Sequence, residues 1–157
     1  MKVMFIFPSV GIKPHERYPS SWIMEPLAIA ALSALTPPGI EKVFYDDRLE
    51  DIPYDEPADL VAISIETYSA KRAYQIADRF RQRGIPVVMG GFHATLAPDE
   101  VALHADAVVL GEAEHLWPHI LQDINSGQLK KRYQDKTRSE WSGTMPDRSI
   151  FKGKRYP

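Results

Sequence analysis

Short apolar runs alternate with amphipathic segments over the first 127 residues of the chain. Five of these runs are apolar almost throughout and lack the strict alternation of a strand with one face in water. They predict strands at Val3–Phe7, Lys42–Tyr45, Leu60–Ile65, Pro86–Met89 and Ala107–Leu110. Such strands are typical of a sheet whose two faces are both covered by helices.

Helices are predicted between the strands. The clearest spans Ser69–Arg83, where apolar residues at positions 73, 76, 77 and 80 share one face. Others are predicted over Pro26–Leu35, from Pro98 onward and over Glu114–Asn125. This alternation favours a parallel sheet with right-handed crossovers. The predicted fold class is therefore α/β, a Rossmann-like or flavodoxin-like sheet of five parallel strands in the order 2-1-3-4-5, flanked by helices.

In a sheet of this order a ligand crevice lies outside the carboxyl ends of the strands. Polar residues and glycines collect at those ends in this sequence, and we take them as candidate ligand-binding residues. They are Pro8 and Ser9 after the first strand, Ser64, Ile65, Glu66 and Thr67 after the third, Gly90, Gly91, His93 and Thr95 after the fourth, and Gly111 and Glu112 after the fifth.

Several of these residues also have a purely structural explanation. Gly90 and Gly91 fit either a tight turn or the close approach of a ligand. Ser64 and Thr67 could cap the following helix. Glu66 is harder to explain, because a carboxylate directly after a buried strand is costly unless helix N–H groups or a ligand bond to it.

The loop between the first strand and the first helix, Pro8–Glu25, is much longer than the roughly two to six residues usual for such a connection. We expect it to have a functional role, and Gly11–Met24 is the part expected to contact substrate. His15 in this loop and His93 are single histidines, for which a hydrogen-bonded or solvated ring and a metal ligand both remain open. No metal site is predicted.

The composition narrows the possibilities further. The 157 residues, 44% of them hydrophobic and 25% charged, predict one globular domain. Because there is no cysteine, this chain alone cannot hold a disulfide, a thiolate zinc site or an iron–sulfur cluster. The longest apolar stretch, Leu27–Leu35, is far shorter than the ~20 residues of a membrane-spanning helix. We therefore expect a soluble cytoplasmic protein without a membrane span.

Charge is unevenly distributed along the chain. Residues 128–157 carry nine lysines and arginines against three acids, a net charge of +6, whereas the whole chain has −2. This tail contains only Leu129 and Ile150 as branched aliphatic residues, so it cannot form a core of its own. It is predicted to be a linker or an arm on the domain surface. A basic nucleic-acid-binding tail is the alternative, which the interspersed acids disfavour.

Four stretches of the sequence resemble a known family. They are Glu25–Leu32, Asp59–Ser64, Val87–Thr95 followed by Pro98, and Ala105–Glu114. Together they are similar to the N-terminal cobalamin-binding domain of B12-binding radical SAM enzymes, and the resemblance runs from about Lys2 to Tyr133. The pairing of Gly-Gly-Phe-His-Ala-Thr with a downstream Gly-Glu-Ala-Glu is its most specific part.

The resemblance implies that residues 1–127 form a domain that binds cobalamin at the carboxyl ends of the strands. It implies that residues 128–157 are a basic linker toward a radical SAM barrel of the same polypeptide. S-Adenosylmethionine and a [4Fe-4S] cluster would belong to that barrel, which would act as a methyltransferase or cyclase. The isolated chain is therefore not expected to be catalytic, and its expected partners are cobalamin and the barrel, not nucleic acid.

Two features depart from the pattern of methionine-synthase-like domains. Those domains carry D-x-H-x-x-G after the first strand, with a histidine that ligates cobalt, whereas Pro8–His15 has no such motif. Cobalamin would then be bound base-off without a protein histidine, or His15 or His93 would substitute. Glu66 stands where leucine is usual. A vestigial domain that serves as scaffold or substrate lid without cobalamin is the alternative, and a free-standing flavodoxin-like binding protein is a third hypothesis.

Overall fold

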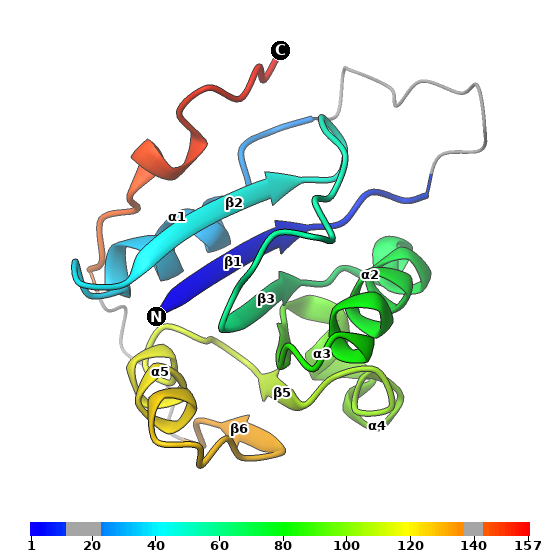
Figure 1. The fold of residues 1–157 in the computed structure, drawn as a ribbon, viewed down its shortest axis with the longest axis vertical. Coiled ribbons are helices and arrows are strands. Elements are labelled where there is room, and N and C mark those ends of the chain that lie inside the picture. The colour runs from blue at the N-terminus through cyan, green and yellow to red at the C-terminus, as the bar shows by residue number, and fades with distance from the viewer. Residues whose placement is uncertain (12–22, 137–142) are drawn as a thin grey trace.

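A parallel β-sheet lies between two layers of helices (Figure 1). The computed structural model describes residues 1–11, 23–136 and 143–157. Within these residues the sheet has six strands in the order β2-β1-β3-β4-β5-β6, and every neighbouring pair is parallel. The strands are β1 Lys2–Phe7, β2 Glu41–Asp46, β3 Leu60–Ser64, β4 Val87–Gly90, β5 Ala107–Leu110 and β6 Arg132–Gln134.

The sequence analysis predicted five strands, and the sheet has a sixth. The predicted order 2-1-3-4-5 is found, and β6 adds to the edge of β5 from within the segment expected to be a linker. The sequence of β6 does not predict a strand, because Arg132 and Gln134 are exposed and only Tyr133 is buried. The Tyr133 hydroxyl donates a hydrogen bond of 2.6 Å to Asp123 and so ties the strand to the helix before it.

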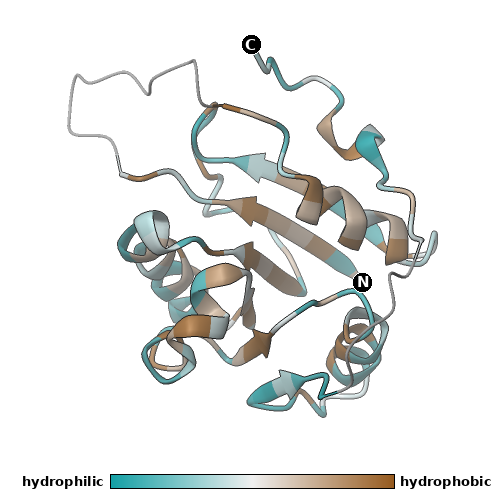
Figure 2. Cartoon of the chain, turned by 180° about the vertical axis from the view of Figure 1, so that it is seen from behind, coloured by the Kyte–Doolittle hydropathy of each residue, from teal (hydrophilic) through white to brown (hydrophobic). Residues whose placement is uncertain are grey.

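Helices cover both faces of the sheet, which leaves the apolar strands at the centre (Figure 2). Helix α2 (Ala70–Gln82) packs on one face with α3 (Phe92–Leu96) and α4 (Pro98–Val101). Helices α1 (Leu27–Leu35) and α5 (Trp117–Asn125) pack on the other. The apolar stripe predicted for α2 is confirmed, since its residues 73, 76, 77 and 80 are all buried. In the part of the chain that the structure describes, no helix has the length and hydropathy needed to cross a membrane.

Two helices differ from the prediction at the edge that carries the candidate residues. Helix α3 follows Gly91 directly, where a loop was expected. Helix α5 begins at Trp117, with a proline in its first turn, so Glu112 and Glu114 precede the helix. Glu112 therefore lies in the loop after β5, and Glu114 lies in a turn that leads into α5, where the N–H of Trp117 donates to the Ala113 carbonyl at 2.8 Å.

The C-terminal segment at residues 143–157, which we call the strap, packs against α1 and β2 (Figure 1). It contains a short 3₁₀ helix, η3 (Arg148–Phe151). Phe151 is buried, with its ring centre 5.6 Å from that of Phe44 on β2. The hydroxyl of Tyr156 donates a hydrogen bond of 2.8 Å to the fully buried carboxylate of Asp46. The strap is thus held to α1 and β2 by a buried ring and a hydrogen bond to a buried carboxylate.

Asp147 anchors the strap by its side chain. Its carboxylate accepts hydrogen bonds from the hydroxyl of Ser149, from that of Ser33 on α1 at 2.7 Å and from the Lys42 ammonium on β2 at 3.1 Å. These donors hold the pKa of Asp147 well below its usual range. Because the pKa is lowered in the folded state, the stabilisation is present above the unfolded pKa of about 4 and is lost as the pH falls below it.

Replacing Asp147 by asparagine is expected to lower the free energy of unfolding at pH 7 by about 1–2 kcal/mol. The difference between wild type and variant should shrink as the pH falls below about 4, because Asp147 of the unfolded chain then binds a proton while the folded carboxylate, with its lowered pKa, stays ionised. Urea unfolding at a series of pH values measures both effects. Asp55→Asn, at an exposed acid, is the control and should leave the stability unchanged. A pH-independent difference would show that the charge of Asp147 does not anchor the strap.

Candidate functional site: a cavity at the carboxyl ends of the strands

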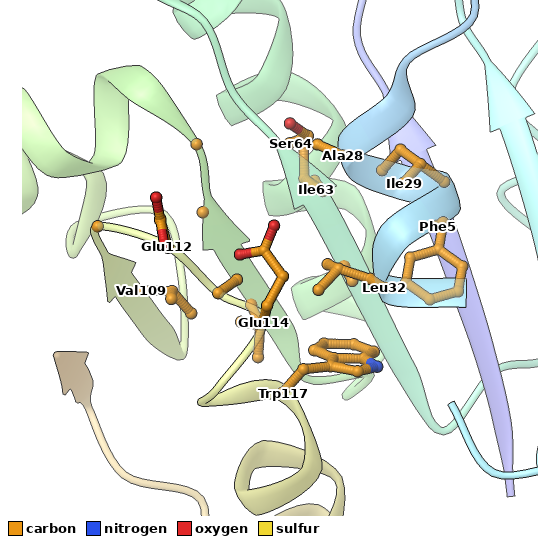
Figure 3. A pocket seen from close by; sticks show the side chains of 16 residues that line it. Phe5, Ala28, Ile29, Leu32, Ile63, Ser64, Val109, Glu112, Glu114 and Trp117 are labelled. Carbon is orange, nitrogen blue, oxygen red and sulfur yellow. The ribbon is translucent and has the colours of Figure 1, made fainter. Parts of the chain in front are cut away.

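A cavity of about 190 Å³ opens between α1 and α5, at the carboxyl ends of β3, β4 and β5 (Figure 3). Its walls are apolar and come from both the sheet and the two helices. The strands contribute Phe5, Ala62, Ile63, Val88 and Val109, and the helices contribute Ala28, Ile29, Leu32 and Trp117. The cavity therefore lies on the edge where the sequence predicted a ligand crevice.

Five of the twelve predicted residues line this cavity. They are Ser64, Gly90, Gly91, Gly111 and Glu112. Ser64, the last residue of β3, is half-buried, and its side chain is drawn at the cavity edge in Figure 3. Within the described residues its hydroxyl makes no hydrogen bond to the protein. A hydroxyl at the edge of an apolar cavity is a group that a bound ligand could satisfy.

Gly91 is required by the backbone itself. Its φ of +108° lies in a region that side chains rarely adopt, and a Cβ atom would come within 2.9 Å of the Ile65 carbonyl oxygen. A Cβ at Gly90 would meet Val109 alone, its side chain at 3.4 Å and its carbonyl oxygen at 4.0 Å. The tight-turn explanation thus holds for Gly91, whereas Gly90 keeps space open between β4 and β5.

Pro8 and Ser9 lie at the end of β1 and are buried. The backbone N–H and hydroxyl of Ser9 donate to Asp47 at 3.0 and 2.6 Å, and Arg72 on α2 donates to the same carboxylate at 2.7 and 2.8 Å. Burial alone raises the pKa of Asp47, but the bonds from Arg72 and Ser9 outweigh it, so the pKa is lowered. In this arrangement Ser9 fixes the start of the loop that follows β1.

The residues after β3 join it to α2 through a short 3₁₀ helix, η2 (Thr67–Ser69). Ile65 is fully buried in the core on the α2 face. Glu66 precedes η2, where its backbone N–H donates to the Ser69 hydroxyl at 3.2 Å. Burial raises the pKa of Glu66. Glu66 is half-buried and does not line the cavity.

His93 and Thr95 belong to α3 and have protein partners. The His93 ring is buried, with Nδ1 3.2 Å from the Thr67 hydroxyl and Nε2 3.4 Å from the Glu100 carboxylate. The Thr95 hydroxyl accepts a hydrogen bond of 2.9 Å from the N–H of Gly111, which joins the loops after β4 and β5. His15 and the loop 12–22 lie outside the described residues.

Sequence reasoning missed the apolar part of the site. Phe5, Leu32 and Trp117 fall within a predicted strand and two predicted helices, and nothing in a single apolar run marks which side chains border a cavity. Two residues could have indicated the cavity from the sequence. Ala28 and Ala62 stand among larger apolar residues and leave room on facing elements. Glu114 was noted at a helix start, but the structure places it on the cavity lining.

Polar groups are confined to the more exposed part of the cavity. Glu112 is exposed and Glu114 half-buried, whereas Trp117 is only 1% exposed. Among residues 1–11, 23–136 and 143–157, no group of three or more histidines and acids is placed to hold a metal ion. An apolar pocket with a few placed polar groups is typical of a site for a small-molecule ligand or cofactor.

Comparison with known proteins identifies the family. The family model of the B12-binding domain matches residues 27–121, which are more than half of the chain. The chain belongs to the B12-binding domain family. The matched region contains every residue of the cavity lining except Phe5 on β1. The cavity is therefore built almost entirely from the part of the chain that defines the B12-binding domain.

Two relatives come from Chlorobaculum tepidum. One, named bacteriochlorophyllide d C-8(2)-methyltransferase, is 45% identical over 111 residues, which are 70% of this chain and 25% of that protein. The other, named bacteriochlorophyllide d C-12(1)-methyltransferase, is 37% identical over 117 residues, 73% of this chain and 26% of that protein. The B12-binding domain described here thus spans about a quarter of the length of either relative. No solved structure matches the chain.

Proposed function

We propose that this chain binds cobalamin at the carboxyl ends of its strands, with the nucleotide tail in the cavity between α1 and α5. The observation that carries the proposal is the apolar cavity itself, which opens at the edge where an open parallel sheet binds ligands. An apolar cavity of about 150 Å³ takes up a benzene ring. The 190 Å³ found here suits a larger aromatic base.

The residues that would hold the cofactor are of two kinds: glycines that leave space, and polar side chains that can form hydrogen bonds. Gly90 and Gly111 leave room at the strand ends, and the Ser64 hydroxyl offers a hydrogen bond to a ligand. Glu112 and Glu114 can accept hydrogen bonds from the amide and hydroxyl groups in which cobalamin is rich. Bound cobalamin would supply a cobalt centre that carries a methyl group. The chain contributes binding, orientation and exclusion of water.

We further propose that the corrin is held base-off and without a histidine ligand. The loop after β1 lacks the D-x-H-x-x-G motif, and His93 is engaged with Thr67 and Glu100. No histidine among the described residues lines the cavity. His15 remains the one alternative ligand that the sequence offers near this loop.

For the whole protein we propose a cobalamin-dependent radical SAM enzyme that methylates a chlorophyllide-type tetrapyrrole. The support is the similarity to two proteins named bacteriochlorophyllide methyltransferases, each about four times as long as the matched region. S-Adenosylmethionine and a [4Fe-4S] cluster would be held by a barrel to which residues 128–157 lead. We place the enzyme in the cytoplasm, and we expect no catalysis from this chain alone.

Titration with hydroxocobalamin tests the proposal, followed by reduction to cob(II)alamin and electron paramagnetic resonance. We expect saturable binding and a cobalt signal without nitrogen splitting, because neither the tail nor a histidine ligates the metal. Nitrogen splitting that disappears in His15→Ala would replace the base-off hypothesis by histidine ligation. If no cobalamin binds, the domain is a vestigial scaffold or substrate lid.

A further inference from the structure

The deep wall of the cavity offers no polar partner to a ligand. Phe5 and Trp117 are 0% and 1% exposed, and their ring centres lie 5.5 Å apart. The only polar atom of these side chains, the indole N–H of Trp117, donates to the Thr36 hydroxyl at 2.9 Å. In Figure 3 the indole nitrogen accordingly points away from the cavity.

The backbone of the walls is also engaged. Ala62 and Val88 are register partners in the β3–β4 pair, and Val109 is paired with Tyr133 of β6. Ladder hydrogen bonds in these pairs use the strand N–H and carbonyl groups. The polar side chains of the lining, Ser64, Glu112 and Glu114, all come from strand ends or the loop after β5. A ligand group that reaches the Phe5–Trp117 wall therefore meets hydrocarbon alone.

From this lining we propose that the cavity selects cobamides by their lower base, favouring an apolar benzimidazole or phenol over a purine. The inference rests on the proposed function, because it concerns which tail enters the cavity. Adenine and dimethylbenzimidazole share an imidazole ring. They differ in the six-membered ring, which carries two methyl groups in one base and two ring nitrogens and an amino group in the other. Those purine atoms lose water on entry and gain no partner.

Leu32 provides a way to change this selectivity. It lines the cavity from α1 and is only half-buried, so an asparagine there introduces a donor and an acceptor at modest cost to the fold. Leu35 is half-buried on the same helix and does not line the cavity. Leu35→Asn is thus the matched control for Leu32→Asn.

The experiment compares the affinities of the 157-residue chain for cobalamin, adeninylcobamide, cresolylcobamide and cobinamide, which has no base, by calorimetry. We expect cobalamin and cresolylcobamide to bind at least about tenfold more tightly than adeninylcobamide. Leu32→Asn should reduce this preference about threefold or more, and Leu35→Asn should preserve it.

Three outcomes would overturn the inference in distinguishable ways. Equal affinity for cobalamin and adeninylcobamide rejects base selection but leaves cobalamin binding intact. Equal affinity for cobalamin and cobinamide shows that the tail does not use the cavity at all. No binding of any corrinoid rejects the proposed function and the inference together. Because the comparison of four ligands uses the wild-type chain, it decides the matter even if Leu32→Asn does not fold.

Discussion

Replacing Gly91 by alanine is expected to lower the free energy of unfolding by about 3 kcal/mol. Two effects add at this position. A side chain at φ +108° and ψ −172°, a backbone region essentially restricted to glycine, costs about 1–3 kcal/mol in strain. The new Cβ would also lie 2.9 Å from the carbonyl oxygen and 3.0 Å from the nitrogen of Ile65, and neither is the end of a flexible side chain.

The surrounding backbone has little freedom to move away. The N–H of Ile65 donates to Gly90 at 2.8 Å, and the N–H of His93 donates to the carbonyl of Ile65 at 3.1 Å. Relief of the clash would have to weaken these bonds, which connect β3, β4 and α3. For a domain that is stable by about 5–15 kcal/mol, a loss of this size should visibly shift the unfolding midpoint.

Gly84→Ala is the control for a positive-φ glycine without a close approach. Gly84 has a φ of +75°, but a Cβ there would meet no atom within 4 Å. Its replacement should therefore cost only the backbone strain, about 1 kcal/mol. Urea unfolding of both variants gives the comparison. Equal losses would show that Ile65 yields to the new side chain, and that the close approach at Gly91 is not what requires glycine.

The fold could be predicted from the sequence because its strands are short, apolar and separated by clear helical patterns. The five predicted strands are found within two residues of their expected ends, and the family match agrees with the fold class. β6 was missed for a physical reason: a three-residue edge strand has one buried side chain, Tyr133, and no periodicity to detect. Helix α3 was missed because its start depends on the unusual backbone of Gly91.

The site was only partly predictable from the sequence, because its polar edge can be recognised in the sequence and its apolar wall cannot. Glycines and polar residues at strand ends stand out against an apolar background, and Ser64, Gly90 and Gly111 indeed border the cavity. The residues of the apolar wall do not stand out in this way, because Leu32 and Trp117 cannot be told from other core residues until the helices are placed. The sequence also could not show that the Ser9 hydroxyl donates a hydrogen bond to Asp47, 38 residues away.

Filling the cavity from α1 should abolish cobalamin binding while the fold persists. Ala28 lines the cavity and is exposed, so a tryptophan at this position can occupy the space without displacing core residues. We expect Ala28→Trp to weaken cobalamin binding at least about a hundredfold, or roughly 2.7 kcal/mol. The loss follows from volume alone, because the nucleotide tail and the indole compete for the same 190 Å³.

Ala34→Trp is the matched control, since Ala34 is exposed on the same helix and does not line the cavity. It should bind cobalamin like the wild type, and both variants should unfold at the wild-type urea concentration. Calorimetric titration of the three proteins with cobalamin and with cobinamide completes the test. Ala28→Trp should retain most of its affinity for cobinamide, which lacks the tail that needs the cavity. If cobalamin binds Ala28→Trp as tightly as the wild type, the tail lies elsewhere and the cavity between α1 and α5 is not its site.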